Sequence, residues 1–522
     1  MDNRFYFGFN TSEERKKRRK AELYSMSEQV STFFWDEAPQ HGLEMREGQQ
    51  DMSFEIVDAL INDQHFAIEA GVGIGKSFGY LVPVLLYSKR MNKPVIIATS
   101  TIALQEQLWR DVHAVMPLLG LNRDVILAKG QTHYLCNKRA DEYMCDPKAD
   151  PPDALKEGIK QGYEERKDFP EVLPQGVWDK VNVQRFSMKN CGSCEKKCKY
   201  YKVRAALKFT DGVVLCNQDF LTQHLMKLRR GQEGLINAAA DLLVVDEAHN
   251  LDDKVRSATT ERFGQGMLFG MIKNAFYELR SFDQSSVSGE KREAESAIIA
   301  FYNCLKAQVQ KQINEAEQDM RYADRFFFDN NGSAIELLTE MNAAIHNLSS
   351  SIQIYSSMDF RNNRSFAASD DLDAVSESLS ELLDQIDDML IWIEQHGSNT
   401  ELVYCPKNTK EIVSRLYFNG DERTILTSAT LTNATSGSLE EQYSYFISNT
   451  GFPAGDRGCL SEPKPSPYPY DEHAMIYYCD DLPHPTREHE AFIEKGVERL
   501  LEILSISNGK ALVLFTAKTD ME

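Results

Sequence analysis

The chain has 522 residues and a formal net charge of −21, from 58 Lys and Arg against 79 Asp and Glu. Its 42% hydrophobic and 26% charged residues are ordinary for a globular protein, and 522 residues are too many for one domain. No apolar run reaches the length of about eighteen residues that a membrane helix needs, and the first ten residues lack a secretory signal. We therefore expect a cytoplasmic protein with no membrane partner.

Charge is unevenly distributed along the chain. A basic run at residues 15–20 is expected to be a solvated helix or tail. Residues 370–394 carry nine acidic and no basic side chains, whereas residues 185–230 carry eleven basic and three acidic ones. Because the two signs are segregated, the negative total does not exclude a local surface that binds nucleic acid.

Strand-like and helix-like segments alternate in the first part of the chain. A short apolar strand is predicted at residues 66–69, the β-branched run at residues 95–98 is typical of a buried parallel strand, another such strand is predicted at residues 242–245, and residues 79–86 predict a helix. Another strand is predicted at residues 424–427. This alternation is typical of α/β architecture.

Between residues 255 and 406 the hydrophobic period changes to three and four residues. Helices are predicted at residues 267–279, 296–313, 334–354 and 372–393, and strand signals are hard to find. We interpret this part as a mostly helical insertion. Strand signals resume at residues 474–479 and 511–515, with a helix at about 488–507 between them.

A glycine-rich turn follows the first predicted strand and opens the first predicted helix. Its glycines let backbone amides and the helix N-terminus face a phosphate, Lys76 would reach the β- and γ-phosphates, and the Ser77 hydroxyl would bind Mg²⁺. The strict pattern G-x-x-x-x-G-K-[ST] has glycine where Ala70 stands, so the match is imperfect. The predicted phosphate-binding residues are Ala70, Gly71, Val72, Gly73, Ile74, Gly75, Lys76 and Ser77.

Asp246 and Glu247 follow the predicted strand at residues 242–245. A Mg-nucleotide site needs a carboxylate at the end of a neighbouring strand and a second acid that orients the attacking water. Asp246 suits the first role and Glu247 the second. The alternative is a surface acidic turn, which the lysine and serine of the glycine-rich turn make the weaker interpretation.

Asp246-Glu247-Ala248-His249 resembles the DEAH box of superfamily 2 helicases, and further segments resemble the DinG/XPD-like branch of that superfamily. Residues 46–52, with Gln49, resemble its adenine-reading segment, and residues 98–105 its strand-gripping segment. Residues 427–431, with Ser428, Ala429 and Thr430, resemble the segment that couples the ATP and DNA sites. Residues 512–516 resemble the first strand motif of a second motor domain.

The resemblance implies a RecA-like motor domain that hydrolyses ATP with Mg²⁺, with Lys76, Asp246, Glu247 and His249 as catalytic residues. It implies 5′→3′ movement on single-stranded or forked DNA, in DNA repair or replication. Single-strand-binding protein is a candidate partner, and a monomer is expected. The family's later motifs would lie beyond Glu522, so we expect this polypeptide alone to hydrolyse ATP weakly; the alternative is a non-catalytic module that binds nucleotide and single-stranded DNA.

Cys191, Cys194 and Cys198 form a compact trio, and Cys136 lies upstream. Four converging thiolates suit either tetrahedral zinc or an iron–sulfur cluster, and the chemistry alone leaves both open. One distant cysteine followed by a tight trio resembles the [4Fe–4S] arrangement of the DinG/XPD-like helicases. Cys145 is a less favoured substitute for Cys136. Cys216 follows the apolar run at residues 213–215, which predicts that it is a core residue.

The trio lies in the basic stretch, where cations could neutralise phosphates and tyrosine rings could stack on unpaired bases. The alternative for any single residue is a solvated helix face with half-buried tyrosines. Gln218 and Gln131 depart from the family's usual His and Arg, which puts fine DNA contacts in doubt. The residues of this patch are Lys196, Lys197, Lys199, Lys202 and Arg204 with Tyr200 and Tyr201.

The long gaps between motifs require inserted modules, because compact α/β units connect in far fewer residues. We predict a basic extension (1–44), an iron–sulfur module (128–204), a helical arch (255–406) and the start of a second RecA-like domain (471–522). The first RecA-like motor domain is predicted at residues 45–127, 205–254 and 407–470.

Overall fold

The computed structural model describes residues 12–170, 173–184, 191, 194, 197–279, 281–315, 323–357, 367–485, 487–515 and 521. The chain divides into two compact units, Met1–Ser466 and Pro467–Glu522, which are described separately. Within the described residues, no helix is long and apolar enough to cross a membrane.

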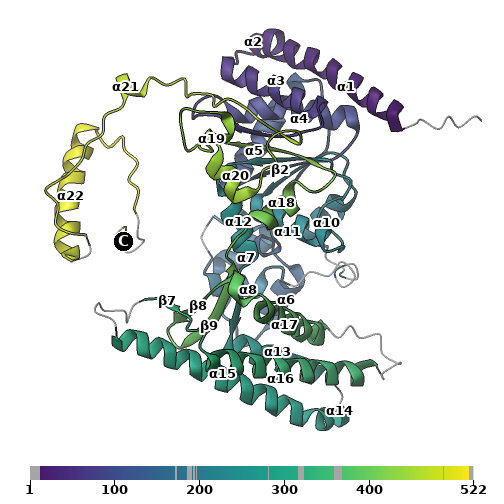
Figure 1. Cartoon of the computed structure of the whole chain (residues 1–522), viewed down its shortest axis with the longest axis vertical. Helices are drawn as coiled ribbons and strands as arrows, with labels where there is room; N and C mark the ends of the chain where they lie inside the picture. Colours follow the sequence, from purple (N-terminus) through teal and green to yellow (C-terminus); the bar gives the residue numbers. More distant parts are fainter. Residues whose placement is uncertain are drawn as a thin grey trace, which may run out of the picture. The chain divides into compact units, whose positions relative to one another are not determined.

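The first unit is built on a seven-stranded sheet in which every strand pair is parallel (Figure 1). The strand order is β11-β1-β10-β5-β2-β4-β3. The predicted strands form β1, β2, β5 and β10, which confirms the α/β class. The strands are β1 (His65–Glu69), β2 (Val95–Thr99), β3 (Val125–Leu127), β4 (Val213–Asn217), β5 (Leu242–Asp246), β10 (Arg423–Ser428) and β11 (Gly458–Leu460).

Helices cover both faces of this sheet because successive strand side chains point to opposite sides. Ile68 and Ile97 pack in the core on one face, whereas Ala67 and Ile96 pack in the core on the other. The first face is covered by α1 (Ser12–Thr32), α3 (Glu47–Ile61), α4 (Lys76–Met91) and α5 (Ile102–Leu118). The second face is covered by α11 (Gln218–Arg229), α12 (Leu251–Ala258), α18 (Lys410–Tyr417) and α20 (Ser444–Thr450).

The insertion after α12 contains a helical bundle, as the sequence predicts, together with a four-stranded antiparallel sheet in the order β6-β9-β8-β7. Figure 1 shows the long helices α15 and α16 running side by side. The helices are α13 (Gln265–Glu278), α14 (Ser281–Ser286), α15 (Ser288–Glu315), α16 (Gly332–Ser357) and α17 (Ala367–Asp384). The strands are β6 (Glu261–Gly264), β7 (Arg325–Phe327), β8 (Met389–His396) and β9 (Asn399–Pro406).

The predicted helix at residues 372–393 is wrong in its second half, since α17 ends at Asp384 and β8 begins at Met389. The sequence signal for the strand is the turn that follows β8. Gly397 has φ 60°, and His396 pairs with Asn399 across a two-residue turn. Such a turn needs a left-handed residue and joins two strands into a hairpin. The hairpin partner therefore decides the conformation of the apolar run before it.

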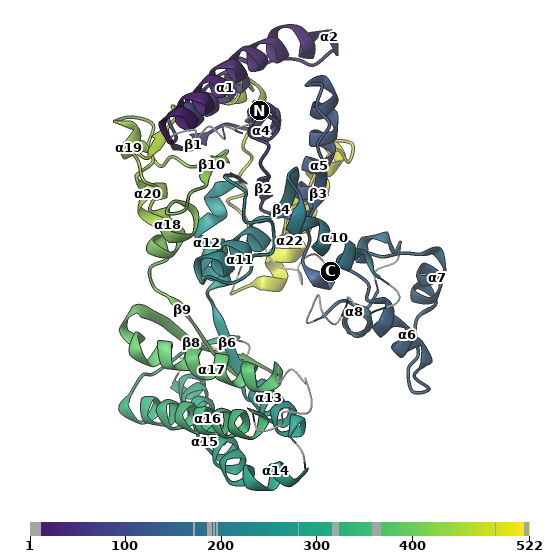
Figure 2. The same cartoon turned by 90° about the vertical axis from the view of Figure 1, so that its right-hand side faces the viewer.

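The cysteine-rich region between β3 and β4 contains short helices around small cores. Figure 2 shows α6, α7 and α8 grouped on the side of the unit where α10 lies. The helices are α6 (Asn137–Cys145), α7 (Asp153–Gln161), α8 (Gln175–Val181) and α10 (Lys199–Phe209).

The second unit contains α21 (Tyr470–His473) and the predicted long helix as α22 (His489–Ile506). The strands expected at residues 474–479 and 511–515 are not formed, so that prediction is wrong for the described residues. Their apolar side chains are exposed, including Ile476 and Leu512. A strand needs a hydrogen-bonded neighbour, and no described strand pairs with either segment.

Candidate nucleotide site and cysteine module

Three neighbouring strands bring the predicted nucleotide residues to one edge of the parallel sheet. In the register of β10 with its two neighbours, Ser428 lies opposite Glu69 of β1, and Thr427 lies opposite Asp246 of β5. The carboxyl ends of parallel strands form a common edge, and ligands bind in the crevice outside it. The glycine-rich turn, the Asp246 turn and the Ser428 segment therefore start from adjacent points.

The glycine-rich turn between β1 and α4 adopts the backbone conformation that its glycines permit. Gly75 has φ 87°, and a Cβ atom there would lie 2.4 Å from the Gln49 side-chain nitrogen. Gln49 Nε2 donates to the Gly75 carbonyl at 2.9 Å. Its Oε1 is buried and has no hydrogen-bond partner among the described residues. Gln49 therefore supports the turn and keeps one acceptor for a donor such as an adenine amine.

Lys76 and the two acids of the DEAH box meet at this edge. Lys76 Nζ lies 3.3 Å from Glu247 Oε1, and the buried Tyr80 hydroxyl donates to Asp246 Oδ2 at 3.5 Å. Burial, followed by the adjacent Glu247 charge, raises the pKa of Asp246 to about 6. Two acids beside one lysine on a partly buried edge form an arrangement suited to a cation and phosphates.

Gln218 holds the backbone of the DEAH box, a role that the sequence does not reveal. It is buried at the start of α11, and its Nε2 donates to the Asp246 carbonyl at 2.7 Å and to the Glu247 carbonyl at 3.0 Å. Glu247 has φ 55°, a left-handed conformation that a non-glycine residue adopts at a cost. The two hydrogen bonds from Gln218 stabilise this turn and so fix the direction of the Glu247 side chain.

His249 connects the DEAH box to the predicted coupling segment. Its Nδ1 lies 2.6 Å from Ser428 Oγ and 3.4 Å from Glu247 Oε2. Ser428 Oγ also donates to Glu247 Oε2 at 3.4 Å and accepts from the Thr430 amide at 3.3 Å. Ala429 lies between Ser428 and Thr430 in the chain. His249, Ser428 and Glu247 thus form one hydrogen-bonded cluster, while Thr430 extends it along the segment.

Glu69, the residue before the glycine-rich turn, also binds the coupling segment. Glu69 Oε2 accepts hydrogen bonds from the Leu431 amide at 2.6 Å, the Thr432 amide at 2.6 Å and the Thr432 hydroxyl at 2.9 Å. The phosphate-loop pattern assigns no role to this position, so sequence reasoning missed it. Its carboxylate joins the phosphate loop to the coupling segment directly.

Two of the predicted cysteine ligands, Cys136 and Cys198, lie at a small core that contains two tyrosines. Cys136 packs against a small core that contains Tyr134, Tyr200 and Cys198. Burial raises the pKa of Tyr200 and outweighs the lowering by the Arg204 charge, and the Cys191 and Cys198 thiols add to the rise. The Cys194 amide donates to the Cys191 carbonyl at 3.0 Å.

The two remaining cysteines of this region, Cys145 and Cys216, do not belong to the small core around Tyr134 and Tyr200. Cys145 is exposed at the end of α6, and Cys216 is buried in β4, as expected for a core residue. Among the described residues, no group of three or more Cys, His, Asp or Glu is close enough to hold a metal ion.

Ion pairs anchor this region to the parallel sheet. Lys129 is buried after β3, and its Nζ lies 2.7 Å from Glu106 of α5 and 2.9 Å from Glu165. Lys167 also pairs with Glu106 at 2.8 Å, and Lys199 of α10 pairs with Glu165 at 2.5 Å. Burial opposes ionisation of Glu106, but hydrogen bonds from two lysines outweigh it and lower its pKa to about 2.

The basic patch is only partly available to a ligand. Tyr200 is buried in the core, and the buried Arg204 donates to the Leu235 carbonyl. These two residues therefore pack and hold the fold and do not face a ligand. Lys197 and Lys202 are exposed, and Tyr201 is half-buried with Lys197 Nζ 4.5 Å from its ring centre. Lys196 lies outside the described residues.

The parallel sheet, with helices on both faces and a glycine-rich loop at its carboxyl edge, is consistent with a RecA-like helicase domain. Comparison with known families narrows this class, since the DEAD_2 family matches residues 132–266. A probable ATP-dependent helicase of Bacillus subtilis, YpvA, is 24% identical over 93% of this chain and 74% of its own length. The chain is thus similar over most of its length to a protein named as a probable ATP-dependent helicase.

Two further relatives are similar over smaller shares of their length. The B. subtilis protein named 3′-5′ exonuclease DinG is 25% identical over 91% of this chain and 55% of its own length. The ATP-dependent DNA helicase YoaA of Escherichia coli is 30% identical over 43% of this chain and 36% of its own length. The chain thus spans about half or less of these two proteins.

Proposed function

We propose that the chain is an ATP-dependent DNA helicase of the DinG-like type that acts on single-stranded or forked DNA. The observation that carries this proposal is the cluster in which Glu247 contacts Lys76 at 3.3 Å and both His249 and Ser428 at 3.4 Å. A nucleotide-binding lysine, an acid and a coupling segment in direct contact are what a motor needs to link ATP hydrolysis to DNA movement.

The turn at residues 70–77 and Lys76 would hold the phosphates, and Gln49 would read the adenine. Its unpartnered Oε1 supports that role. Ser77 and Asp246 would hold Mg²⁺, which neutralises phosphate charge during hydrolysis. Glu247 would orient the attacking water, and its contact with His249 would pass the state of the site to Ser428, Ala429 and Thr430.

We also propose that Cys136, Cys191, Cys194 and Cys198 hold a [4Fe–4S] cluster in a module at residues 128–204, which requires these four thiols to come closer together than they lie in the structure. The packing of Cys136 beside Cys198 supports this, and so does the action of Cys191 and Cys198 on one tyrosine. Iron–thiolate bonds would join distant points of a region that has only small cores. Iron and sulfide analysis of the purified chain distinguishes the cluster from zinc.

The finer predictions from the resemblance belong to the same proposal. They are 5′→3′ movement, a role in DNA repair or replication, a monomeric state, a cytoplasmic location, single-strand-binding protein as a partner and the predicted domain boundaries. Displacement of a strand from forks with either a 5′ or a 3′ tail tests the direction.

ATP hydrolysis with and without single-stranded DNA tests the main proposal. Lys76→Ala should weaken Mg-ATP binding by about a hundredfold, because a charge-assisted phosphate contact is lost. Glu247→Gln should keep Mg-ATP binding and lower hydrolysis by about a hundredfold or more. If the unchanged chain hydrolyses no faster than Glu247→Gln while binding both ligands, the non-catalytic alternative is correct. The same assay measures whether turnover of this polypeptide is low, as the sequence predicts.

A further inference from the structure

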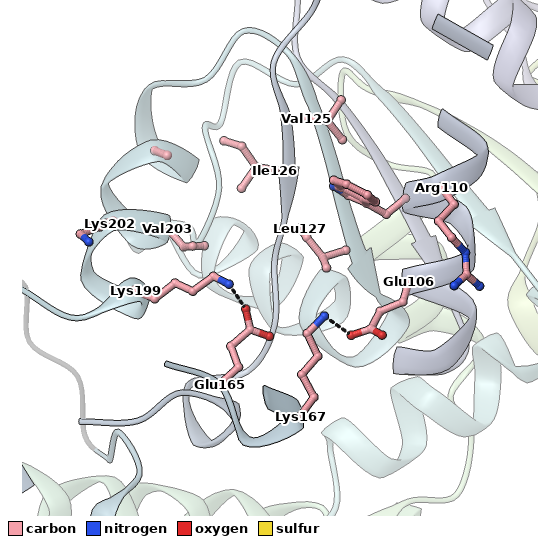
Figure 3. Close-up of a pocket in the computed structure, with 12 residues that line it drawn as sticks. Glu106, Arg110, Val125, Ile126, Leu127, Glu165, Lys167, Lys199, Lys202 and Val203 are labelled. Carbon is pink, nitrogen blue, oxygen red and sulfur yellow. Dashed lines mark hydrogen bonds and ion pairs between the residues drawn. The ribbon is translucent and has the colours of Figure 1, made fainter. Parts of the chain in front are cut away.

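A cavity of about 610 Å³ lies between α5 and α10, over the edge strand β3 (Figure 3). Its lining includes all three residues of β3, Val125, Ile126 and Leu127, together with Trp109 of α5 and Val203 of α10. The cavity lies on the flank of the sheet and shares no lining residue with the nucleotide site. Its size falls within the range of small-molecule sites and is sufficient for one nucleotide.

Cations surround this apolar floor. Figure 3 shows Lys199 and Lys202 on one side of β3, with Arg110 on the other and Lys167 below. The two carboxylates of the lining, Glu106 and Glu165, are already neutralised by Lys129, Lys167 and Lys199 at 2.5–2.9 Å. Lys202 is exposed, and its ion pair with Glu164 is a long one of 4.0 Å. An excess of positive charge in a chain of net charge −21 indicates an anionic ligand.

Trp109 adds a flat surface to this site. Trp109 is 40% exposed, and the centre of its ring lies 3.9 Å from the centre of the His113 ring. His113 Nδ1 in turn lies 2.7 Å from the Trp109 carbonyl oxygen, which fixes the histidine beside it. An aromatic face next to lysines is the combination that binds unpaired nucleotides, because bases stack on the ring and phosphates contact the cations.

We propose that this cavity binds one unpaired nucleotide of single-stranded DNA, with the base against Trp109 and β3 and the phosphate near Lys202. The proposal rests on the proposed function and adds a contact site to it. A peptide strand added to the edge of β3 is the competing occupant. The three-residue length of β3 gives such a strand few main-chain hydrogen bonds, whereas the tryptophan and the cations favour the nucleotide.

Fluorescence anisotropy of a labelled oligothymidylate with the full chain tests this site. Trp109→Ala should weaken binding about tenfold, the loss expected for one stacked base. Lys202→Gln should lower the slope of log affinity against log salt by about 0.7, the value for one phosphate contact on a single strand. Trp35→Ala is the matched control, since Trp35 is 70% exposed and lies outside the cavity lining, and it should bind like the unchanged chain.

Photocrosslinking with 5-iododeoxyuridine in the oligonucleotide provides a second measurement that does not depend on a variant folding. A crosslink on the peptide that contains Trp109 supports the proposal. Crosslinks confined to other peptides, together with unchanged affinity of Trp109→Ala and Lys202→Gln, overturn the cavity proposal and leave DNA binding intact. Failure of the unchanged chain to bind the oligonucleotide overturns both this proposal and the proposed function.

Discussion

The nucleotide edge of the parallel sheet and the cysteine module are held together in different ways. At the nucleotide edge, residues 362 positions apart, Glu69 and Leu431, are joined by a 2.6 Å hydrogen bond that needs no ligand. The sheet register fixes these positions, and helices bury both of its faces. The cysteine module has only small cores, and the buried side chains of Lys129 and Glu165 join it to α5 and α10 by ion pairs.

This difference has a physical consequence for each site. A site fixed by a two-sided sheet is organised before its ligand binds, so loss of one side chain should change function more than stability. A small module buries too little apolar surface to be stable alone, so its stability should depend on bound metal and on its anchoring contacts.

The largest effect is expected from the proposed cluster ligands. Cys136→Ser should remove iron from the purified chain and make residues 128–204 sensitive to protease, because metal binding supplies much of the folding free energy of such modules. The rest of the first unit should keep its unfolding temperature. Cys145→Ser is the matched control, since this cysteine is exposed at the end of α6, the helix that Cys136 precedes. Equal iron content in both variants would contradict the assignment of Cys136.

The next largest effect is expected from the anchor between the module and the sheet. Lys129→Met should destabilise the region by about 3 kcal/mol, because two carboxylates lose a shared buried partner. The readout is the rate of proteolysis between β3 and β4. Lys156→Met is the control in the same module, and little change is expected because its partner Asp153 is exposed. If both variants were cleaved at the same rate, the ion pairs of Lys129 would not be what stabilises the module.

A smaller effect, on activity and not on stability, is expected at the nucleotide edge. Gln218→Ala removes both hydrogen bonds that hold the DEAH turn, which should cost about 2 kcal/mol in its positioning. DNA-stimulated hydrolysis should fall about tenfold or more with Mg-ATP affinity nearly unchanged. Gln218→His restores one ring N–H donor and should recover part of the rate. If Gln218→Ala lowered both the nucleotide affinity and the unfolding temperature, the nucleotide edge would be no more preorganised than the cysteine module.

The sequence was sufficient where one local pattern decides the structure. The apolar runs of β1, β2, β5 and β10 are buried on both faces, so they could form little else than central strands. The residues with roles fixed by tertiary contacts were not predictable in this way. Gln218 was identified as a departure from a motif, and only the structure shows that its amide supports two backbone carbonyls. Glu69 was missed because its partner segment begins 362 residues later.

The smallest effect is expected from mild acid. It should lower the stability of the parallel-sheet core without weakening the ion pairs that anchor the cysteine module. Burial, followed by nearby lysine and arginine charges, lowers the pKa of His224 to about 4, below its ordinary value of 6.5. The unfolded chain therefore takes up a proton between pH 6.5 and 4 that the folded chain excludes, so stability is full above pH 6.5 and falls as the pH drops through that window. At pH 5.5 the loss from this residue is about 1 kcal/mol.

His224→Asn should flatten that dependence. Its amide oxygen can still accept from the Leu235 and Ile236 amides, which His224 Nδ1 binds at 3.0 and 3.2 Å, but it takes up no proton. The unfolding temperature of the first unit at pH 7.5 and 5.5 measures the difference, with the exposed His41→Asn as control. Because the pKa of Glu106 is about 2, the ion pairs of Lys129 stay charged over this range, and protease sensitivity of the module should not rise with that loss. A parallel rise would mean that the sheet and the module unfold together and share one source of stability.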